Sequence, residues 1–393
     1  MAQGAAARLS NTDPDEGWSL PAWTYSDAEF HAVEMERVMR PSWQVVCHVS
    51  DVPNWGDYHT LEYLGESIVV MRGKDQSLRA FTNVCRHRGA RLLDGPSGCT
   101  KSLVCPYHAW TYNLDGSFRG MPLRETYGDI DTTKLHLASV EMEVFHGFIF
   151  VRLEGGGPSV AQMLAPYDAE IADYRFEDLR SLGRMTMRPR HVNWKNVGDN
   201  YSDGLHIVVA HPGLKRLMGT GYGVDATDYA DKMWGPIVDD PSSNPSERAY
   251  QHFLPHVPHL PQERQRLWTY FKLWPNIAFD IYPDQVDFMQ WLPVSPTECL
   301  IREISYAIPD ERREMKAARY LNWRINRQVN KEDTWLIGRV QDGMASQSFA
   351  VGPLGETEVA LRNFCRRIRA LIPEARQHRA PAPGWSRRPR AVE

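Results

Sequence analysis

Residues 81–118, FTNVCRHRGARLLDGPSGCTKSLVCPYHAWTYNLDGSF, carry the pattern that decides the fold of the first part of this chain. Within them, the clusters CRH at 85–87 and CPYH at 105–108 each offer one thiolate and one imidazole. These groups are soft and borderline metal ligands, and their spacing lets two tight turns point four of them at a common centre. The stretch therefore predicts a metal site.

Two kinds of metal site fit one Cys-His pair per loop. In a Rieske [2Fe-2S] centre, two cysteines hold one iron, two histidines hold the other, and the neutral imidazoles raise the reduction potential. The other kind is a Cys2His2 zinc site, although zinc fingers usually pair Cys with Cys and His with His. The four ligands favour the cluster and leave zinc open.

The residues around these ligands resemble the cluster-binding loops of the Rieske ring-hydroxylating oxygenases, in their terminal components. The matching motifs are CRHRG at 85–89 and CPYHAW at 105–110, followed by YNLDG at 112–116. Ala109 stands where that family usually has Gly, a change of one methyl group. The resemblance implies a Rieske [2Fe-2S] cluster bound by Cys85, His87, Cys105 and His108.

Composition is that of a globular protein rather than a nucleic-acid or membrane protein. The chain has 393 residues, more than one typical core, and a net charge of -4. That charge argues against a nucleic-acid partner, and no apolar run is long enough to span a membrane. Because residues 1–17 lack the apolar core of a signal peptide, we expect a cytoplasmic protein whose other cysteines are free thiols, namely Cys47, Cys99, Cys299 and Cys365.

Proline and glycine residues typical of turns and loops divide the chain into three segments. Residues 1–40 form an N-terminal segment with a helix that begins at Ser26, in the capping box SDAE, and stops before Pro41. Residues 41–157 form the Rieske [2Fe-2S] domain, where short β-branched and aromatic runs predict an antiparallel β-sandwich that carries the loops. The run GGGP at 155–158 marks the start of a catalytic domain at 158–393.

We expect the catalytic domain to be an antiparallel sheet covered by helices, which makes the whole chain an α+β protein. A helical pattern at 160–174 and a strand at 181–192 come first, and residues 212–265 are weakly periodic, as loops and short helices over a pocket are. Residues 267–308 alternate apolar and polar positions, which predicts the sheet. Helices over 311–346 and 356–371 follow, and the Pro- and Arg-rich tail after Pro373 is expected to be solvated.

A second metal site is indicated by DGLHIVVAH at 203–211. Two histidines and a carboxylate are what a non-haem iron(II) site needs, with one face of the metal left open for O2 and substrate. His206 and His211 are five residues apart and do not share a face of a regular helix. We therefore expect a π-type turn or, preferably, a helix that ends at His211 because Pro212 follows.

The same segment, with NWKN at 193–196 and DNY at 199–201, resembles the iron-binding segment of the oxygenase family. The resemblance implies that His206 and His211 bind a mononuclear Fe(II). It also implies that Asp203 bridges the two metal centres by a hydrogen bond to a cluster histidine, by analogy His108, of a neighbouring subunit in a head-to-tail homotrimer.

The third iron ligand is expected from the long helix, where KEDTW at 331–335 precedes VQDG at 340–343. The family places an Asp in such a helix a turn or two before a Gln, which points to Asp333, although Gly338 stands where many relatives have an acidic residue. Glu332 and Asp342 are the rivals, about 100° and about 180° round the helix from Asp333. We expect only one of the three to face the histidines.

The resemblance implies the oxygenase component of a Rieske non-haem iron oxygenase. Such an enzyme uses O2 and electrons from NAD(P)H to hydroxylate, or oxidatively N- or O-dealkylate, a small aromatic or N-alkyl compound. The electrons are expected through a separate reductase, with or without a ferredoxin, because the chain has no Gly-rich dinucleotide turn and no plant-type ferredoxin Cys spacing.

Other functions stay open at this point. Arene cis-dihydroxylation is the alternative within the family. A non-enzymatic Rieske electron carrier or a zinc-stabilised binding module explains residues 41–154 but leaves the second metal site without a role. Six aromatic residues lie where family pockets are lined, but aromatic residues in sheets are more often core than ligand contacts: Trp234, Phe253, Trp268, Phe271, Phe288 and Trp291.

Overall fold

The computed structural model describes residues 15–387, so the first residues of the N-terminal segment and the end of the Arg- and Pro-rich tail lie outside the described part. The chain forms two compact units. The smaller unit contains Arg40–Gln162 and Arg175–Ser181, and the larger unit contains the rest of the described residues. Among those residues, no helix is both long and apolar enough to cross a membrane. None of the six cysteines forms a disulfide.

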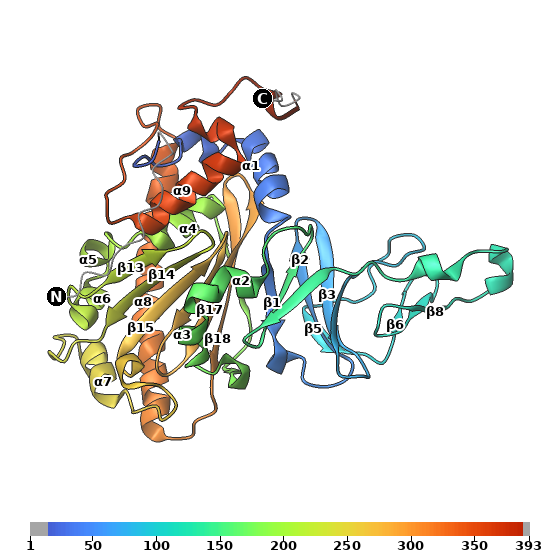
Figure 1. The fold of residues 1–393 in the computed structure, drawn as a ribbon, viewed down its shortest axis with the longest axis horizontal. Helices are drawn as coiled ribbons and strands as arrows, with labels where there is room; N and C mark the ends of the chain where they lie inside the picture. The colour runs from blue at the N-terminus through green and yellow to red at the C-terminus, as the bar shows by residue number, and fades with distance from the viewer. Residues whose placement is uncertain (1–14, 388–393) are drawn as a thin grey trace. The chain divides into compact units, whose positions relative to one another are not determined.

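The smaller unit consists of antiparallel strands joined by turns and loops (Figure 1). One sheet has the order β1 (Gln44–His48), β10 (Phe148–Arg152) and β9 (Glu141–Phe145). A second has the order β4 (Leu78–Thr82), β3 (Glu66–Arg72), β2 (Asp57–Tyr63) and β5 (Ser97–Cys99). A third has the order β6 (Leu103–Val104), β7 (Thr111–Tyr112) and β8 (Phe118–Gly120). The expected all-antiparallel β-domain is confirmed.

The core of the smaller unit reaches into the two loops that the sequence singled out. Val69 of β3 and Phe81 of β4 belong to the same buried cluster as Cys85 and Cys105. The β-branched run of β3 packs well on a half-buried sheet surface. The scaffold therefore fixes the two sulfur-bearing loops through hydrophobic packing.

The larger unit is built on one antiparallel sheet. Its order is β18 (Glu298–Ala307), β17 (Val286–Ser295), β16 (Ile277–Ile281), β15 (Leu267–Leu273), β14 (Ala230–Pro236) and β13 (Gly223–Ala226), and β12 (Thr186–Arg190) pairs with β18. The strands expected within 267–308 and 181–192 are confirmed. Short helices lie within 212–265, as expected, but β13 and β14 also lie there and extend the sheet, which the weak periodicity did not predict.

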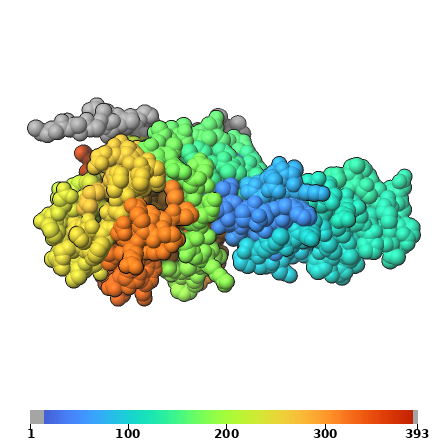
Figure 2. Space-filling model, turned by 90° about the horizontal axis from the view of Figure 1, so that it is seen from below, coloured from blue at the N-terminus to red at the C-terminus, as the bar shows by residue number. Residues whose placement is uncertain are grey.

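Helices cover this sheet, as expected. The long helix α8 (Arg313–Met344) lies alongside it, and α9 (Val359–Leu371) follows. The segment at 160–174 is broken into α2 (Val160–Leu164), a 3-10 turn and α3 (Asp168–Ala172), with Pro166 in the turn. Helix α7 (Pro245–Phe253) packs against α8, and Figure 2 shows the yellow and orange segments together at the surface.

The N-terminal helix starts one residue later than the capping box suggested. Asp27, not Ser26, is the N-cap, and its carboxylate accepts a hydrogen bond from the Phe30 amide at 2.7 Å. Helix α1 (Ala28–Glu34) then continues as a π-helical turn, Met35–Met39, before Pro41. The helix packs into the larger unit through Glu34, whose Oε1 lies 2.8 Å from Lys195 Nζ of α4 (Trp194–Ser202), with both side chains fully buried.

Candidate metal centres

Two matching turns hold the four donors of the first site, in the smaller unit. In one, the Cys85 amide donates to the Ala90 carbonyl and the Gly89 amide donates to the Cys85 carbonyl. In the other, the Cys105 amide donates to the Trp110 carbonyl and the Ala109 amide donates to the Cys105 carbonyl. Gly89 has φ 73° and Ala109 has φ 55°, so the alanine occupies the left-handed position that glycine fills in the partner loop.

The four donors separate into a sulfur pair and a nitrogen pair. His87 Nδ1 and His108 Nδ1 lie 3.2 Å apart, and the His87 ring stacks on Trp110 with a centroid distance of 4.6 Å. Cys85 Sγ lies 3.4 Å from the Tyr112 hydroxyl inside the core. Among residues 15–387, no three of these four donors come within 4.8 Å of one another, as one tetrahedral zinc would require. Two pairs instead fit two iron ions, one bound by sulfur and one by nitrogen.

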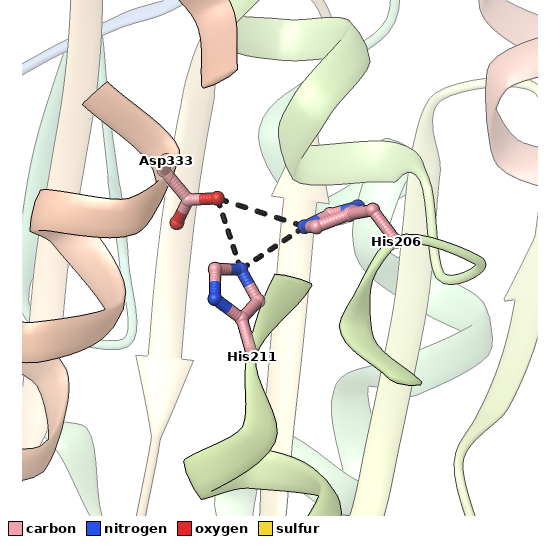
Figure 3. A group of neighbouring side chains, drawn as sticks. All are labelled: His206, His211 and Asp333. Atoms are coloured by element: carbon pink, nitrogen blue, oxygen red, sulfur yellow. Dashed lines mark hydrogen bonds and ion pairs between the residues drawn. The ribbon is translucent and has the colours of Figure 1, made fainter. Parts of the chain in front are cut away.

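The second site, in the larger unit, lies where α4, α5 (Ile207–Ala210), α6 (Pro212–Met218) and α8 meet. His206 Nε2 and His211 Nε2 lie 3.2 Å apart, and Asp333 Oδ1 lies 3.6 Å from the first and 3.0 Å from the second. Figure 3 shows the carboxylate of α8 pointing at both imidazoles. These three are the one group within the described residues that brings three metal-ligand donors so close.

The local chain path explains how histidines five residues apart meet. His206 caps α5 at its start and His211 at its end, where φ -114° and ψ 73° leave the helical region. The next residue, Pro212, is the first of α6. Proline disfavours helical geometry in the residue before it, which explains why α5 ends at His211. The expected helix end at His211 is confirmed.

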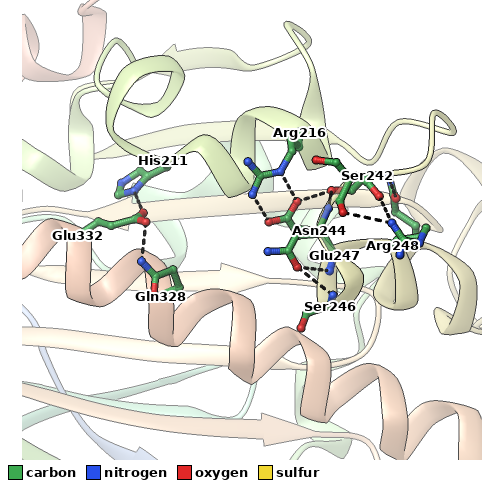
Figure 4. Close-up of polar contacts among 11 residues, drawn as sticks. His211, Arg216, Ser242, Asn244, Ser246, Glu247, Arg248, Gln328 and Glu332 are labelled. Carbon is green, nitrogen blue, oxygen red and sulfur yellow. Dashed lines mark hydrogen bonds and ion pairs between the residues drawn. The ribbon is translucent and has the colours of Figure 1, made fainter.

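A second carboxylate lies behind each histidine. Asp203, the C-cap of α4, has Oδ2 3.2 Å from His206 Nδ1, and Glu332 has Oε2 2.7 Å from His211 Nδ1. Gln328 donates a hydrogen bond to the other Glu332 oxygen at 2.8 Å, as the left side of Figure 4 shows. Each imidazole therefore has its Nδ1 held by a carboxylate and its Nε2 turned toward Asp333, the usual arrangement of metal-binding histidines.

Of the three candidate acids of α8, only Asp333 lies against both histidines, whereas Glu332 contacts His211 alone. Glu332 and Asp333 both reach His211, at opposite ring nitrogens. The longer Glu side chain makes up for the angular offset of one residue along the helix. Asp342, the other rival, is exposed.

Electrostatics at the second site favour positive charge between the three donors. Burial alone would lower the pKa of His206, but hydrogen bonds to Asp203 and Asp333 outweigh burial and raise it to about 9. Burial alone would raise the pKa of Asp333, but His206, His211 and the amide of Asn200, 2.8 Å away, hold it below its usual range. A divalent cation bound there would receive the same stabilisation.

A large cavity adjoins this second site. Its volume is about 1260 Å³, and its lining includes His206, His211 and Asp333 together with Asp280 and Asp287 of the sheet. Of the six aromatic residues weighed as pocket lining or core, Phe288 lines the cavity. Trp268, Phe271 and Trp291 are buried in the core, Trp234 is half-buried away from the cavity, and Phe253 is exposed. The tyrosines that line the cavity instead are Tyr201, Tyr222, Tyr270 and Tyr320.

Sequence reasoning missed two functional candidates, Asp280 and Asp287, and named Glu332 only as a rival for the third iron ligand. The two aspartates interrupt the apolar runs IAFDI and VDFMQW of neighbouring strands. A charged residue within such a run is a usable signal for an active-site wall, because a buried charge is costly without a role. Glu332 carried a weaker signal, as the neighbour of another acid.

The fold and the two sites define an iron-dependent oxidoreductase subunit with one domain for electron entry and one for catalysis. The profile described as "Rieske [2Fe-2S] domain" matches residues 42–139, and the one described as "Ring hydroxylating alpha subunit (catalytic domain)" matches residues 176–374. The chain belongs to this family, the alpha subunits of Rieske ring-hydroxylating oxygenases, whose cofactors are a Rieske [2Fe-2S] cluster and a mononuclear iron.

Curated relatives and solved structures agree with this assignment. The carnitine monooxygenase oxygenase subunit of Escherichia coli (strain K12) is 31% identical over 342 residues, 86% of this chain and 87% of the relative. The glycine betaine monooxygenase oxygenase subunit of Chromohalobacter salexigens is 33% identical over 58% of this chain and 48% of its own length. A crystal structure of the quaternary ammonium Rieske monooxygenase CntA with an inhibitor has TM-score 0.76 and 25% identity, and covers 93% of this chain and 97% of that one.

A more distant structure shares the fold alone. A single-residue variant of naphthalene 1,2-dioxygenase bound to phenanthrene has TM-score 0.73 at 21% identity, and covers 92% of this chain and 93% of that one. Both monooxygenases and dioxygenases therefore occur among the proteins that this chain resembles.

Proposed function

We propose that this oxygenase subunit holds its mononuclear iron with His206, His211 and Asp333 and its cluster with Cys85, His87, Cys105 and His108. The observation that carries the proposal is the convergence of two imidazole nitrogens and one carboxylate oxygen on the wall of a large cavity. Iron bound there supplies O2 activation. Asp203 and Glu332 orient the two imidazoles, and the cavity receives the organic substrate.

The reaction that we favour is hydroxylation of an N-alkyl carbon. One oxygen atom of O2 enters a C–H bond, and the other leaves as water after taking up two electrons and two protons. The product carbinol then loses its N–C bond: the electron pair stays on nitrogen, the hydroxyl loses its proton, and the carbon leaves as an aldehyde. Support comes from the relatives named as monooxygenases of carnitine and glycine betaine.

The electrons come from NAD(P)H through a separate reductase, with or without a ferredoxin. We infer a head-to-tail homotrimer in which Asp203 links the iron site of one subunit to His108 of its neighbour. Asp203 lies at the end of α4 and accepts from the Leu205 amide at 2.7 Å, which positions its carboxylate beside His206. We also infer a cytoplasmic location, where thiols stay reduced.

A product screen tests this function. The iron-loaded enzyme, an unspecific reductase and NADH are offered carnitine, glycine betaine, an N-methylated aromatic amine, a methoxyarene and naphthalene. We expect formaldehyde and a dealkylated product from at least one N-methyl compound. A cis-diol from naphthalene, with no aldehyde from the others, would favour arene dihydroxylation instead.

Iron content separates the oxygenase from the other classes. About three iron and about two sulfide per chain are expected for an oxygenase, and about two iron for a simple electron carrier. Zinc without iron would indicate a binding module.

A further inference from the structure

Two carboxylates face each other on the cavity wall next to the candidate iron site. Asp280 of β16 and Asp287 of β17 are direct cross-strand partners, and Tyr270 of β15 lies opposite Asp280 on the other side. All three line the cavity that also contains His206 and His211. This row of the sheet therefore presents two acids to whatever occupies the cavity.

Neither acid has a cationic partner within the described part of the chain. The Tyr201 hydroxyl donates to Asp280 at 2.5 Å, and the Gln285 amide donates to Asp287 at 2.8 Å, so both receive only neutral hydrogen bonds. A third acid on this wall, Glu303 of β18, differs because Arg188 lies 3.1 Å away. Like charges directly opposite each other in a sheet destabilise it, and burial increases that penalty. The requirements of the fold alone therefore do not explain why Asp280 and Asp287 face each other without a cationic partner.

The side chains next to the two aspartates suit an alkylated cation, and within the described residues none of the cationic groups of the lining forms an ion pair with either aspartate; these groups are Arg184, Arg188, Arg190, Arg319, Arg327 and Lys331. Tyr201, Tyr222 and Tyr270 line the cavity beside the two aspartates. Aromatic faces attract cations, and they accept methyl groups that cannot donate strong hydrogen bonds. An alkylammonium group is recognised by charge and by such faces, whereas an uncharged arene leaves both carboxylates without a counter-charge.

We propose that Asp280 and Asp287 select substrates whose N-alkyl nitrogen is positively charged, and that they hold this nitrogen on the cavity wall beside the histidines. The inference rests on the proposed function and adds to it the charge of the substrate and the residues that recognise that charge. Positive charge on the ligand replaces the missing counter-ion of the pair.

The protonation of the pair supports this role. Burial raises the pKa of each carboxyl to about 7, and in Asp287 the charge of Asp280 adds to the effect. The groups that face the pair are Tyr201 of α4, Tyr270 of β15, Tyr282, Asp284 and Gln285 of the turn after β16, Glu303 and Ser305 of β18, and Asp333 of α8. A cation binds best to the ionised pair, so its affinity should fall as the pH drops from 8 to 6, where the carboxyls take up protons.

Choline and its uncharged isostere 3,3-dimethylbutan-1-ol test the proposal, because they share a shape and differ in one charge. Their binding to the iron-loaded full-length enzyme is measured by calorimetry at pH 8 and pH 6. The variants are Asp280→Asn, Asp287→Asn and the double variant. Asp342→Asn is the matched control, since Asp342 is exposed and does not line the cavity.

We expect choline to bind at least tenfold more tightly than the isostere at pH 8, and less tightly at pH 6. Each single Asn variant should reduce this preference, the double variant should abolish it, and the control should keep it. Equal binding of the two probes, no binding of choline, or an unchanged preference in the double variant overturns the proposal. If the enzyme nevertheless contains mononuclear iron and oxidises naphthalene, the oxygenase assignment stands while this inference fails.

Discussion

At the scale of single residues, the carboxylates around His206 and His211 have separate tasks. The Asp333 carboxylate faces the Nε2 atoms of both histidines, and its Oδ1 lies 3.0 Å from His211 Nε2. A directly bound carboxylate supplies the negative charge that stabilises iron(II), so Asp333→Ala should lose mononuclear iron and activity and keep the visible spectrum of the cluster. Metal analysis and absorption spectra check this. Loss of iron in Asp342→Ala, with iron retained in Asp333→Ala, would contradict the ligand assignment.

Glu332 acts on the iron site through His211. Because its carboxylate fixes the ring orientation and tautomer, Glu332→Ala should weaken Fe(II) binding by about 10- to 100-fold. Glu332→Gln keeps an acceptor oxygen and should lose less affinity. Titration of Fe(II) into metal-free enzyme measures the difference, and rescue by Gln distinguishes orientation from packing. Equal affinities of wild type and Glu332→Ala would remove Glu332 from the site.

Site residues could be predicted from the sequence wherever they belong to a motif with a fixed spacing between residues. Motif resemblance singled out His206, His211 and Asp333, and the structure brings their donor atoms together. Glu332 was rejected because a helical-wheel angle describes where a Cα lies and ignores the reach of a long side chain. Asp280 and Asp287 were missed because which strands are neighbours, and in what register, is decided by tertiary packing.

At the scale of elements, a buried ion pair links helix α1 to helix α4, whose C-cap is Asp203. Lys195 Nζ lies 2.8 Å from Glu34 and 2.9 Å from the Thr24 carbonyl. Removing one partner leaves a buried uncompensated charge, so Glu34→Ala should lower the free energy of unfolding by about 3–5 kcal/mol. Urea denaturation measures this.

The double variant Glu34→Ala/Lys195→Met is the control for that charge effect, because it removes both charges and should recover much of the loss. An exposed pair offers a second control: Glu311→Ala, which breaks the contact with Lys316, should leave the unfolding midpoint nearly unchanged because solvent screens that pair. An unchanged unfolding midpoint in Glu34→Ala would contradict the prediction.

Regular periodicity made most elements predictable. Helix α8 spans Arg313–Met344 within the expected 311–346, because no proline interrupts its pattern. Strand β14 was not predicted, since it reads ADKMWGP and places charged residues, Gly and Pro within seven positions. Pairing with β15 along its whole length stabilises that strand despite its weak propensity.

At the scale of the whole molecule, the proposed trimer makes each iron site depend on a neighbour's cluster. His87→Ala should disable the cluster of a chain, and Asp333→Ala should disable its iron site. An oligomer made of either variant alone should not convert substrate. Coexpression of both in equal amounts should restore about a quarter of wild-type activity, because random mixing gives about a quarter of all chains both an intact iron site and a neighbour with an intact cluster.

The measurement is product formation per chain by purified mixed oligomers, with separately purified variants combined without exchange as the control. Absence of activity in confirmed mixed oligomers would show that electrons do not cross between subunits. Asp203→Asn in the wild-type background adds a check, because it should leave both metals bound and the cluster reducible while turnover is nearly abolished.

The facing pair Asp280 and Asp287 has a consequence for attempts to make this protein withstand heat. Raised pKa values of about 7 mean that the pair's contribution to stability falls as the pH rises from about 4 to 7 and is lost above that. At pH 8, Asp280→Asn should therefore raise the melting temperature of the substrate-free enzyme by a few degrees, measured by calorimetric melting, whereas Asp342→Asn should not. A thermostability screen run without substrate would favour such variants and, with them, enzymes that discriminate less well between charged and uncharged substrates.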